Sequence, residues 1–149
     1  MKKLAILSVL SLGLWTASAQ ICVKNGGTGN GSDWQNAIGD LQQAINLAST
    51  MTPTPDIWVE KGTYTPSHSI NNPSQVNGNL SDPKNTFYIA NASNLKIYGG
   101  FVGNEIRLSD RPADGKSILM GEIIGAENAV LDGCEIVINA TKEDGEKKN

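Results

Sequence analysis

The sequence predicts an all-β fold, a short right-handed parallel β-helix (a solenoid) with an N-terminal capping α-helix. Short apolar runs recur at a spacing near 20 residues, since 21 positions separate Ile97 from Ile118 and 20 separate Ile118 from Ile138. This is the length of one coil of a β-solenoid, whose parallel strands stack ~4.8 Å apart. The Asn-Gly and Asp-Gly turns that a sandwich of hairpins favours are not regularly placed between the runs, so the solenoid is preferred.

The first 19 residues have the pattern of a secretory signal peptide. Lys2 and Lys3 give a positive start, residues 4–15 form an apolar run, and Ala17-Ser18-Ala19 is a small-residue cleavage site. The run is shorter than the ~20 residues that span a bilayer, so we expect no membrane insertion of the mature chain. The sequence therefore predicts cleavage after Ala19 and a protein that is secreted or held at the cell surface or outer membrane.

The mature chain begins with a strand, a turn and a helix. Residues 21–23 (Ile-Cys-Val) are a strand signal, and the glycine-rich residues 25–32 are typical of turns. Asp40 is a good N-cap for a helix over residues 41–49. Positions i, i+3, i+4 and i+7 of that segment are apolar, as an amphipathic helix requires. These positions are Leu41, Ala44, Ile45 and Ala48.

A second strand follows the helix, and a long polar segment follows the strand. Residues 57–59 (Ile-Trp-Val) are a strand signal, and residues 62–66 form an extended, edge-like piece. The order strand, helix, strand favours a parallel crossover over a hairpin. Residues 67–85 are rich in Asn, Ser and Pro, which predicts a surface loop in which ligand contact would be least surprising. We expect His68, in this loop, to have no role.

The stretch from Leu95 to Phe101 organises the second half of the chain. Its apolar residues alternate at Leu95, Ile97 and Phe101 across the Gly99-Gly100 pair. Because two glycines allow a tight turn, the pattern predicts a strand, a corner and a second strand.

The C-terminal end of the predicted solenoid lacks a cap. Strand signals at residues 118–124 and 130–138 are followed by a charged tail, 141–149, without apolar periodicity. We expect the tail to be disordered, which leaves a truncated β-helix domain over residues 20–140. An uncovered last coil exposes strand edges, so self-association through this end is expected.

Charge and cysteine content exclude several functions. Without the leader the chain has ten basic and fifteen acidic side chains, a formal charge of −5 that repels nucleic acid and anionic membranes. Cys22 and Cys134 show no C-x-x-C spacing and His68 is the single histidine, which excludes a zinc site. Both cysteines stand in apolar, strand-like contexts, where free thiols are commoner than a disulfide.

Seven short motifs are distributed over nearly all of the mature chain. They are Ile21-Cys22-Val23-Lys24, Gly29-x-Gly31-Ser32-x-Trp34, Asp40-Leu41-Gln42-x-Ala44-Ile45, Ile57-Trp58-Val59-x-x-Gly62-Thr63-Tyr64-x-Pro66, Ile97-Tyr98-Gly99-Gly100-Phe101-x-Gly103-x-Glu105, Ser109-x-Arg111 and Val130-Leu131-Asp132-Gly133. Together they resemble the opening of right-handed parallel β-helix proteins exported by Bacteroidetes-type bacteria, as in the pectate-lyase-like superfamily and the polymorphic outer-membrane protein repeats. Members are usually far longer, so this chain resembles their N-terminal cap and first coils.

The resemblance implies one enzymatic alternative, a polysaccharide lyase or another carbohydrate-active β-helix enzyme, or an inactive truncated fragment of one. Polysaccharide lyases on this fold bind Ca²⁺ through aspartates and use a basic residue to abstract a proton. The chain has such residue types near its last strands, but no spacing singles out a site. These residues are Glu122, Glu127, Asp132 and Glu135 among the acids, and Arg107, Arg111 and Lys116 among the bases.

No catalytic or metal-binding constellation stands out, so the candidate ligand-binding residues are aromatic and basic. Trp58 alternates with its apolar neighbours and is the best candidate for an exposed aromatic side chain. Tyr64 would join it in a platform for sugar rings. Arg107 and Arg111 complete the candidate set.

These observations predict an exported, non-enzymatic module, a scaffold or adhesin-like protein that binds a polysaccharide or a host-surface glycan. The signal peptide, the coil-length recurrence and the lack of a catalytic pattern are its basis. No cofactor is expected, and Ca²⁺ enters only under the lyase alternative.

Overall fold

The computed structural model describes residues 19–82 and 84–138. Most of the predicted signal peptide and the whole predicted tail, 141–149, lie outside these residues. No described helix is both long enough and apolar enough to cross a membrane. In chain order the elements are β1 (Gln20–Val23), α1 (Leu41–Ser49), β2 (Asp56–Glu60), β3 (Gly62–Tyr64), β4 (His68–Ser69), β5 (Asn72–Val76), β6 (Thr86–Tyr88), β7 (Lys96–Phe101), the 3-10 helix η1 (Leu108–Asp110), β8 (Ser117–Met120), β9 (Glu122–Ile124), β10 (Val130–Asp132) and β11 (Cys134–Val137).

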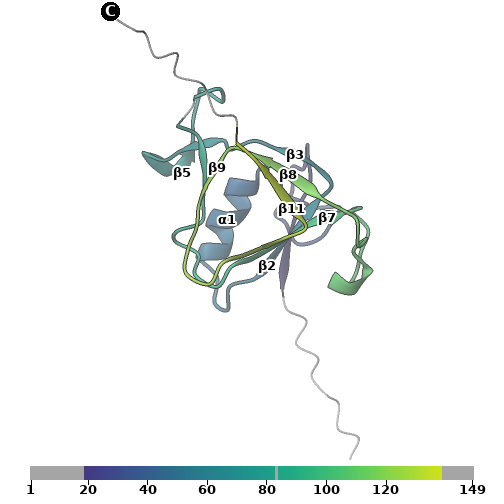
Figure 1. The fold of residues 1–149 in the computed structure, drawn as a ribbon. Helices are drawn as coiled ribbons and strands as arrows, with labels where there is room; N and C mark the ends of the chain where they lie inside the picture. Colours follow the sequence, from purple (N-terminus) through teal and green to yellow (C-terminus); the bar gives the residue numbers. More distant parts are fainter. Residues whose placement is uncertain (1–18, 83, 139–149) are drawn as a thin grey trace, which may run out of the picture.

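The strands form three parallel sheets and one antiparallel pair. The parallel sheets have the strand orders β1-β2-β7-β10, β11-β8-β3 and β6-β9, and β4 pairs with β5 in antiparallel fashion. In Figure 1 the parallel strands outline a triangle, and α1 lies across it. The predicted parallel crossover between residues 21–23 and 57–59 is confirmed, because β1 pairs with β2 in parallel.

The predicted all-β, right-handed parallel β-helix over residues 20–140 is wrong. The described chain is a mixed fold, with one α-helix and four small sheets, one of them antiparallel. The prediction assumed that the polar residues 67–85 form a loop outside a run of parallel strands. Instead, β4 and β5 turn back on each other within that segment, and Ser69 bridges Asn85 in antiparallel fashion.

The core consists of apolar side chains stacked on one another across the parallel strands. Ile21 is opposite Ile57, Ile57 opposite Ile97, and Ile97 opposite Leu131. The first three of these side chains are at most 4% exposed. On the other two sheets the stacked sets are Tyr64, Leu119 and Ile136, and Phe87 and Ile123. At these positions the parallel register therefore keeps like residues on the core face.

The predicted helix over residues 41–49 is confirmed with both its cap and its buried stripe. The Asp40 carboxylate accepts hydrogen bonds from the backbone N–H groups of Gln42 and Gln43, at 2.8 and 3.2 Å. These bonds satisfy donors that the first helical turn leaves unpaired. The apolar stripe of α1 is buried in the same cluster as the inner faces of β1 and β2. Buried Gln42 also joins α1 to β6, through both its amide atoms and the backbone of Tyr88.

The predicted corner at Gly99-Gly100 is wrong, since β7 runs through both glycines as one strand with a bulge. The register against β2 shifts between Trp58 and Glu60, and Gly100 has a φ of +87°. A bulge adds one residue to a strand and so changes the face on which the following side chain lies. Phe101 consequently packs in a second, outer cluster with Trp58 instead of following Ile97 into the core.

Replacing Gly100 by alanine is expected to destabilise the fold. The new Cβ would lie 2.2 Å from the backbone oxygen of Gly115, at a φ that L-residues rarely adopt. The free energy of unfolding should fall by about 2–4 kcal/mol in a denaturant titration. Gly125→Ala is the matched control, because no atom lies within 4 Å of its added Cβ. If the two variants were equally stable, the result would contradict a bulge at Gly100.

Candidate functional site

Trp58 faces away from the core as its alternation predicts, but it is not exposed. Its side chain belongs to the outer cluster and is 7% exposed. The Phe101 ring covers it, with ring centroids 4.8 Å apart and the planes at 11°. The Trp34 ring also packs against Phe101, with ring centroids 5.5 Å apart and the planes tilted at 49°. The expected exposed aromatic platform is therefore absent at Trp58, because residues distant in sequence cover this face of the strand.

The other three predicted residues do not gather around Trp58 in one site. Arg111 lies over the Tyr98 and Phe101 rings and bonds Asp132 through Nη2 at 2.9 Å. Tyr64 is buried in the core, and its hydroxyl donates to the backbone oxygen of Glu60 at 2.9 Å. Arg107 is largely exposed and approaches Asp110 at 3.9 Å. Arg111 and Trp58 thus share Phe101 as a neighbour, whereas Tyr64 and Arg107 lie elsewhere.

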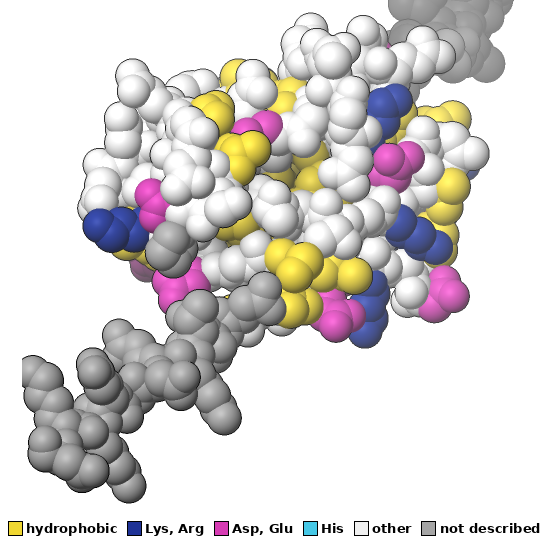
Figure 2. All heavy atoms as spheres, turned by 90° about the horizontal axis from the view of Figure 1, so that it is seen from above, with side chains coloured by type: hydrophobic (Ala, Val, Ile, Leu, Met, Phe, Trp, Pro, Cys, Tyr) yellow, Lys and Arg dark blue, Asp and Glu magenta, His cyan; other side chains and the backbone are white. Residues whose placement is uncertain are grey.

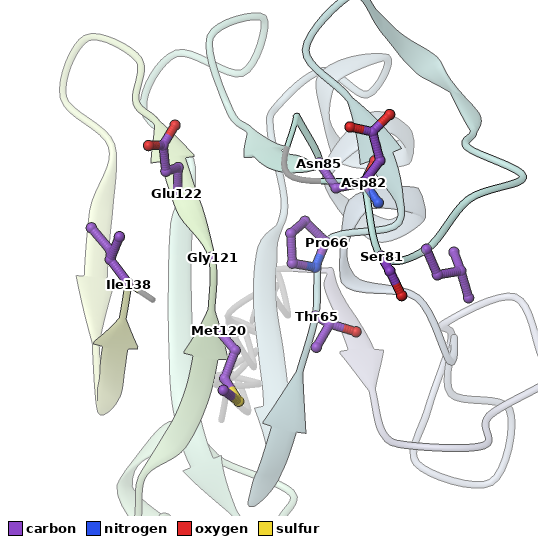
Figure 3. Close-up of a pocket in the computed structure, with 10 residues that line it drawn as sticks. Thr65, Pro66, Ser81, Asp82, Asn85, Met120, Gly121, Glu122 and Ile138 are labelled. Carbon is purple, nitrogen blue, oxygen red and sulfur yellow. The ribbon is translucent and has the colours of Figure 1, made fainter. Parts of the chain in front are cut away.

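Figure 3 shows one of the hollows on the surface, at the end of the sheet that contains β3, β8 and β11. Its volume is about 360 Å³. Thr65-Pro66, Met120 and Ile138 line it from neighbouring segments, and the acids Asp82 and Glu122 lie at its rim (Figure 3). Two carboxylates beside an apolar wall suit a cation better than a neutral ligand. However, no three His, Cys, Asp or Glu side chains within residues 19–82 and 84–138 are placed to hold a metal ion.

A larger groove, of about 690 Å³, lies between α1, the glycine-rich turn and β5. We call it the amide groove, because three side-chain amides line it, those of Asn30, Gln43 and Asn46. The rest of its lining is Gly29, Ile38, Leu47, His68, Ser74 and Val76. The only titratable side chain in this lining is the imidazole of His68. Amides and hydroxyls both donate and accept hydrogen bonds, so the groove is polar without being charged.

The amide groove is held in shape by one hydrogen bond between the helix and the β4–β5 hairpin and by one within the helix. The Nδ2 atom of Asn46 donates to the backbone oxygen of Pro73 at 3.1 Å, and its Oδ1 accepts from Gln42 at 2.9 Å. The Gln43 side chain is exposed and makes no hydrogen bond to another part of residues 19–82 and 84–138. Asn46 therefore positions the wall, whereas Gln43 is available to a ligand.

A chain of three polar side chains reaches the floor of the amide groove. The Ser67 hydroxyl donates to the Asp40 carboxylate, and His68 Nδ1 lies 2.7 Å from the same hydroxyl oxygen. Because the single hydroxyl proton points to Asp40, Nδ1 must carry the ring proton and donate it. The lone pair of the neutral ring is then on Nε2. His68 is 3% exposed, and burial lowers its pKa below 6.5 although the Asp40 carboxylate opposes this.

Neither cysteine adds chemistry to the site. Cys22 is fully buried and Cys134 half-buried, and both are free thiols, as the sequence favoured. Burial raises the pKa of Cys22 to about 12 and that of Cys134 to about 11. Since the thiolate is the reactive form, both groups are unreactive at neutral pH.

Comparison with known proteins gives no family, because no family model, curated protein or solved structure matches the chain.

Sequence reasoning missed most of the amide groove. It placed ligand contact in residues 67–85, which include His68, Ser74 and Val76, but it gave His68 no role. The amides of Asn30 and Gln43 carry no local signal, since exposed Asn and Gln are common in turns and on helix surfaces. The one available signal was the polar face of the helix over residues 41–49, to which Gln43 and Asn46 belong.

The single imidazole allows a direct measurement of its environment. We expect an NMR titration of His68 to give a pKa below 6.5 and the nitrogen shifts of the neutral ring to place its proton on Nδ1. Because the folded state disfavours protonation, stability present above pH 6.5 should be lost as the pH falls through the folded pKa. His68→Gln should flatten this part of the stability profile. A folded pKa at or above 6.5 would contradict the buried, neutral ring.

Proposed function

We propose that this protein is an exported, non-enzymatic surface module that binds a neutral glycan in the amide groove. The observation that carries the proposal is the lining of that groove, in which three amides and a serine hydroxyl accompany an apolar wall. Sugar hydroxyls need partners that both donate and accept, and the apolar faces of a sugar ring need apolar contact. The groove offers both kinds of contact.

The charge of the groove favours a neutral glycan over a uronate polymer. No lysine or arginine lines it, and the mature chain carries a formal charge of −5. A polyanionic substrate would meet no positive partner there and a repulsive net field. The lyase alternative also has no support from the placement of its residues, because Arg111 is bound to Asp132 and the aromatic rings.

The binding test uses an array of neutral and uronic-acid oligosaccharides, followed by calorimetry on the ligands that bind. Neutral oligosaccharides should bind, and Gln43→Ala should weaken binding about three- to tenfold, the effect of about one lost hydrogen bond. Alanine is a good helix former, so this variant should remain folded. Gln35→Ala is the matched control, since Gln35 lines a different hollow.

Three results would contradict the proposal. The first is an array without binding, and the second is binding that Gln43→Ala and Gln35→Ala weaken equally. The third is the accumulation of unsaturated uronate products in the presence of Ca²⁺. The last result would establish the lyase alternative.

Export is tested separately from binding. When the chain is expressed in a bacterium with its own leader, mass spectrometry of the exported product should show an N-terminus at Gln20. Ala19→Arg should block this processing, because the cleavage site requires small residues. Retention of the uncleaved chain inside the wild-type culture would contradict the export half of the proposal.

A further inference from the structure

His68 uses its two ring nitrogens differently. Nδ1 donates to the Ser67 hydroxyl, at 2.7 Å, and this hydroxyl donates in turn to the Asp40 carboxylate. No group within residues 19–82 and 84–138 forms a hydrogen bond to Nε2. Because the ring proton is on Nδ1, the Nε2 atom carries a lone pair and can only accept. The side chain therefore presents an unsatisfied acceptor.

This acceptor can be reached from the amide groove. His68 is 3% exposed and lines the groove, so the surface that it keeps lies there. Nε2 is not sealed from solvent, since Trp58 Nε1 is the one side-chain nitrogen or oxygen of the described residues that is both sealed and without a partner. A buried acceptor without a hydrogen bond costs free energy, which a hydroxyl entering the groove would recover.

The position of the His68 ring is fixed from two sides. Backbone pairing places His68 opposite Val76 of β5. Its side chain is joined through Ser67 to Asp40, the N-cap of α1. Because α1 and β5 also supply walls of the groove, the ring keeps its place relative to those walls. A preorganised acceptor loses less conformational freedom on binding than the exposed amide of Gln43 does.

We propose that His68 Nε2 accepts a hydrogen bond from a sugar hydroxyl at the floor of the amide groove, and that this bond restricts binding to the neutral ring. The inference rests on the proposed function, because the hydroxyl belongs to the neutral glycan assigned to the groove. A neutral partner suits the molecule, since the face in Figure 2 is mostly neither charged nor hydrophobic (white).

An acceptor-only group adds selectivity that the amides do not provide. The amides of Asn30 and Gln43 donate and accept, so they tolerate a hydroxyl in several orientations. Nε2 of His68 requires a donor at one place. A saccharide without a hydroxyl there leaves the acceptor unsatisfied, and buried polar groups discriminate between ligands in this way.

Protonation of the ring would remove this acceptor, because a charged imidazole carries N–H groups on both nitrogens. Asp40 is the charged group that faces the ring, through Ser67. The elements packed against His68 add no further charge: α1 and β5 contain no charged residue, and Tyr88 is the titratable residue of β6. Burial outweighs Asp40 and keeps the pKa of His68 below 6.5. Glycan binding should therefore weaken as the pH falls through that pKa.

The experiment follows the His68 ring nitrogens by NMR on the purified, isotope-labelled protein. The probes are cellohexaose, xylohexaose, maltohexaose and mannohexaose. A saccharide that binds should shift the Nε2 resonance, whereas Nδ1 should keep its proton and its bond to Ser67. The same saccharide should lower the pKa of His68 further, because coupling between ligand and proton is reciprocal.

A variant without the acceptor tests the same bond by affinity. His68→Phe keeps a ring of similar size, and it should weaken binding of that saccharide about three- to tenfold at neutral pH. It should also abolish the loss of affinity on acidification. Gln35→Ala, in a different hollow, is the control that should keep both the affinity and its pH dependence.

The outcomes separate this inference from the proposed function. A saccharide that binds without shifting Nε2, or whose affinity for the wild type does not fall on acidification, would overturn the role of His68 and leave glycan binding intact. A lack of binding by all four saccharides would overturn both. If circular dichroism shows His68→Phe to be unfolded, the NMR result on the wild type alone decides.

Discussion

The structure depends on the in-register stacking of aliphatic side chains across parallel strands. Ile21, Ile57 and Ile97 occupy equivalent positions on three successive strands, and each buries its neighbour. A slip by one residue would turn all of them outward at once, so the register is strongly specified. The outermost side chain of the stack has a neighbouring strand on one side only, so its other side must be covered by another element. The apolar stripe of α1 covers the core beside Ile21, whereas none of the helices and strands described covers Leu131.

A second constraint acts on the opposite face of the same strands. The bulge in β7 places Phe101 over Trp58, and Arg111 then lies over Phe101 while bonding Gly99 and Asp132 through Nη1 and Nη2. Aromatic and basic side chains that suggest a sugar-binding surface are thus used to hold the outer loops on the sheet. These side chains are therefore not free to form the sugar-binding platform that the sequence predicted.

Local patterns in the sequence predicted the parts of the fold that local chemistry decides. The helix over residues 41–49, its Asp40 cap and the parallel relation of β1 and β2 follow from spacing and order alone. The bulge at Gly100 does not, because it depends on pairing with β2 and on the close approach of Gly115. The β4–β5 hairpin joins neighbouring residues, but their polar sequence has no apolar alternation that would indicate strands. The alternation of residues 57–59 predicted which face of the strand Trp58 lies on, but it could not predict that Phe101 covers it. The amide groove could not be predicted either, because its walls come from three separate segments of the chain.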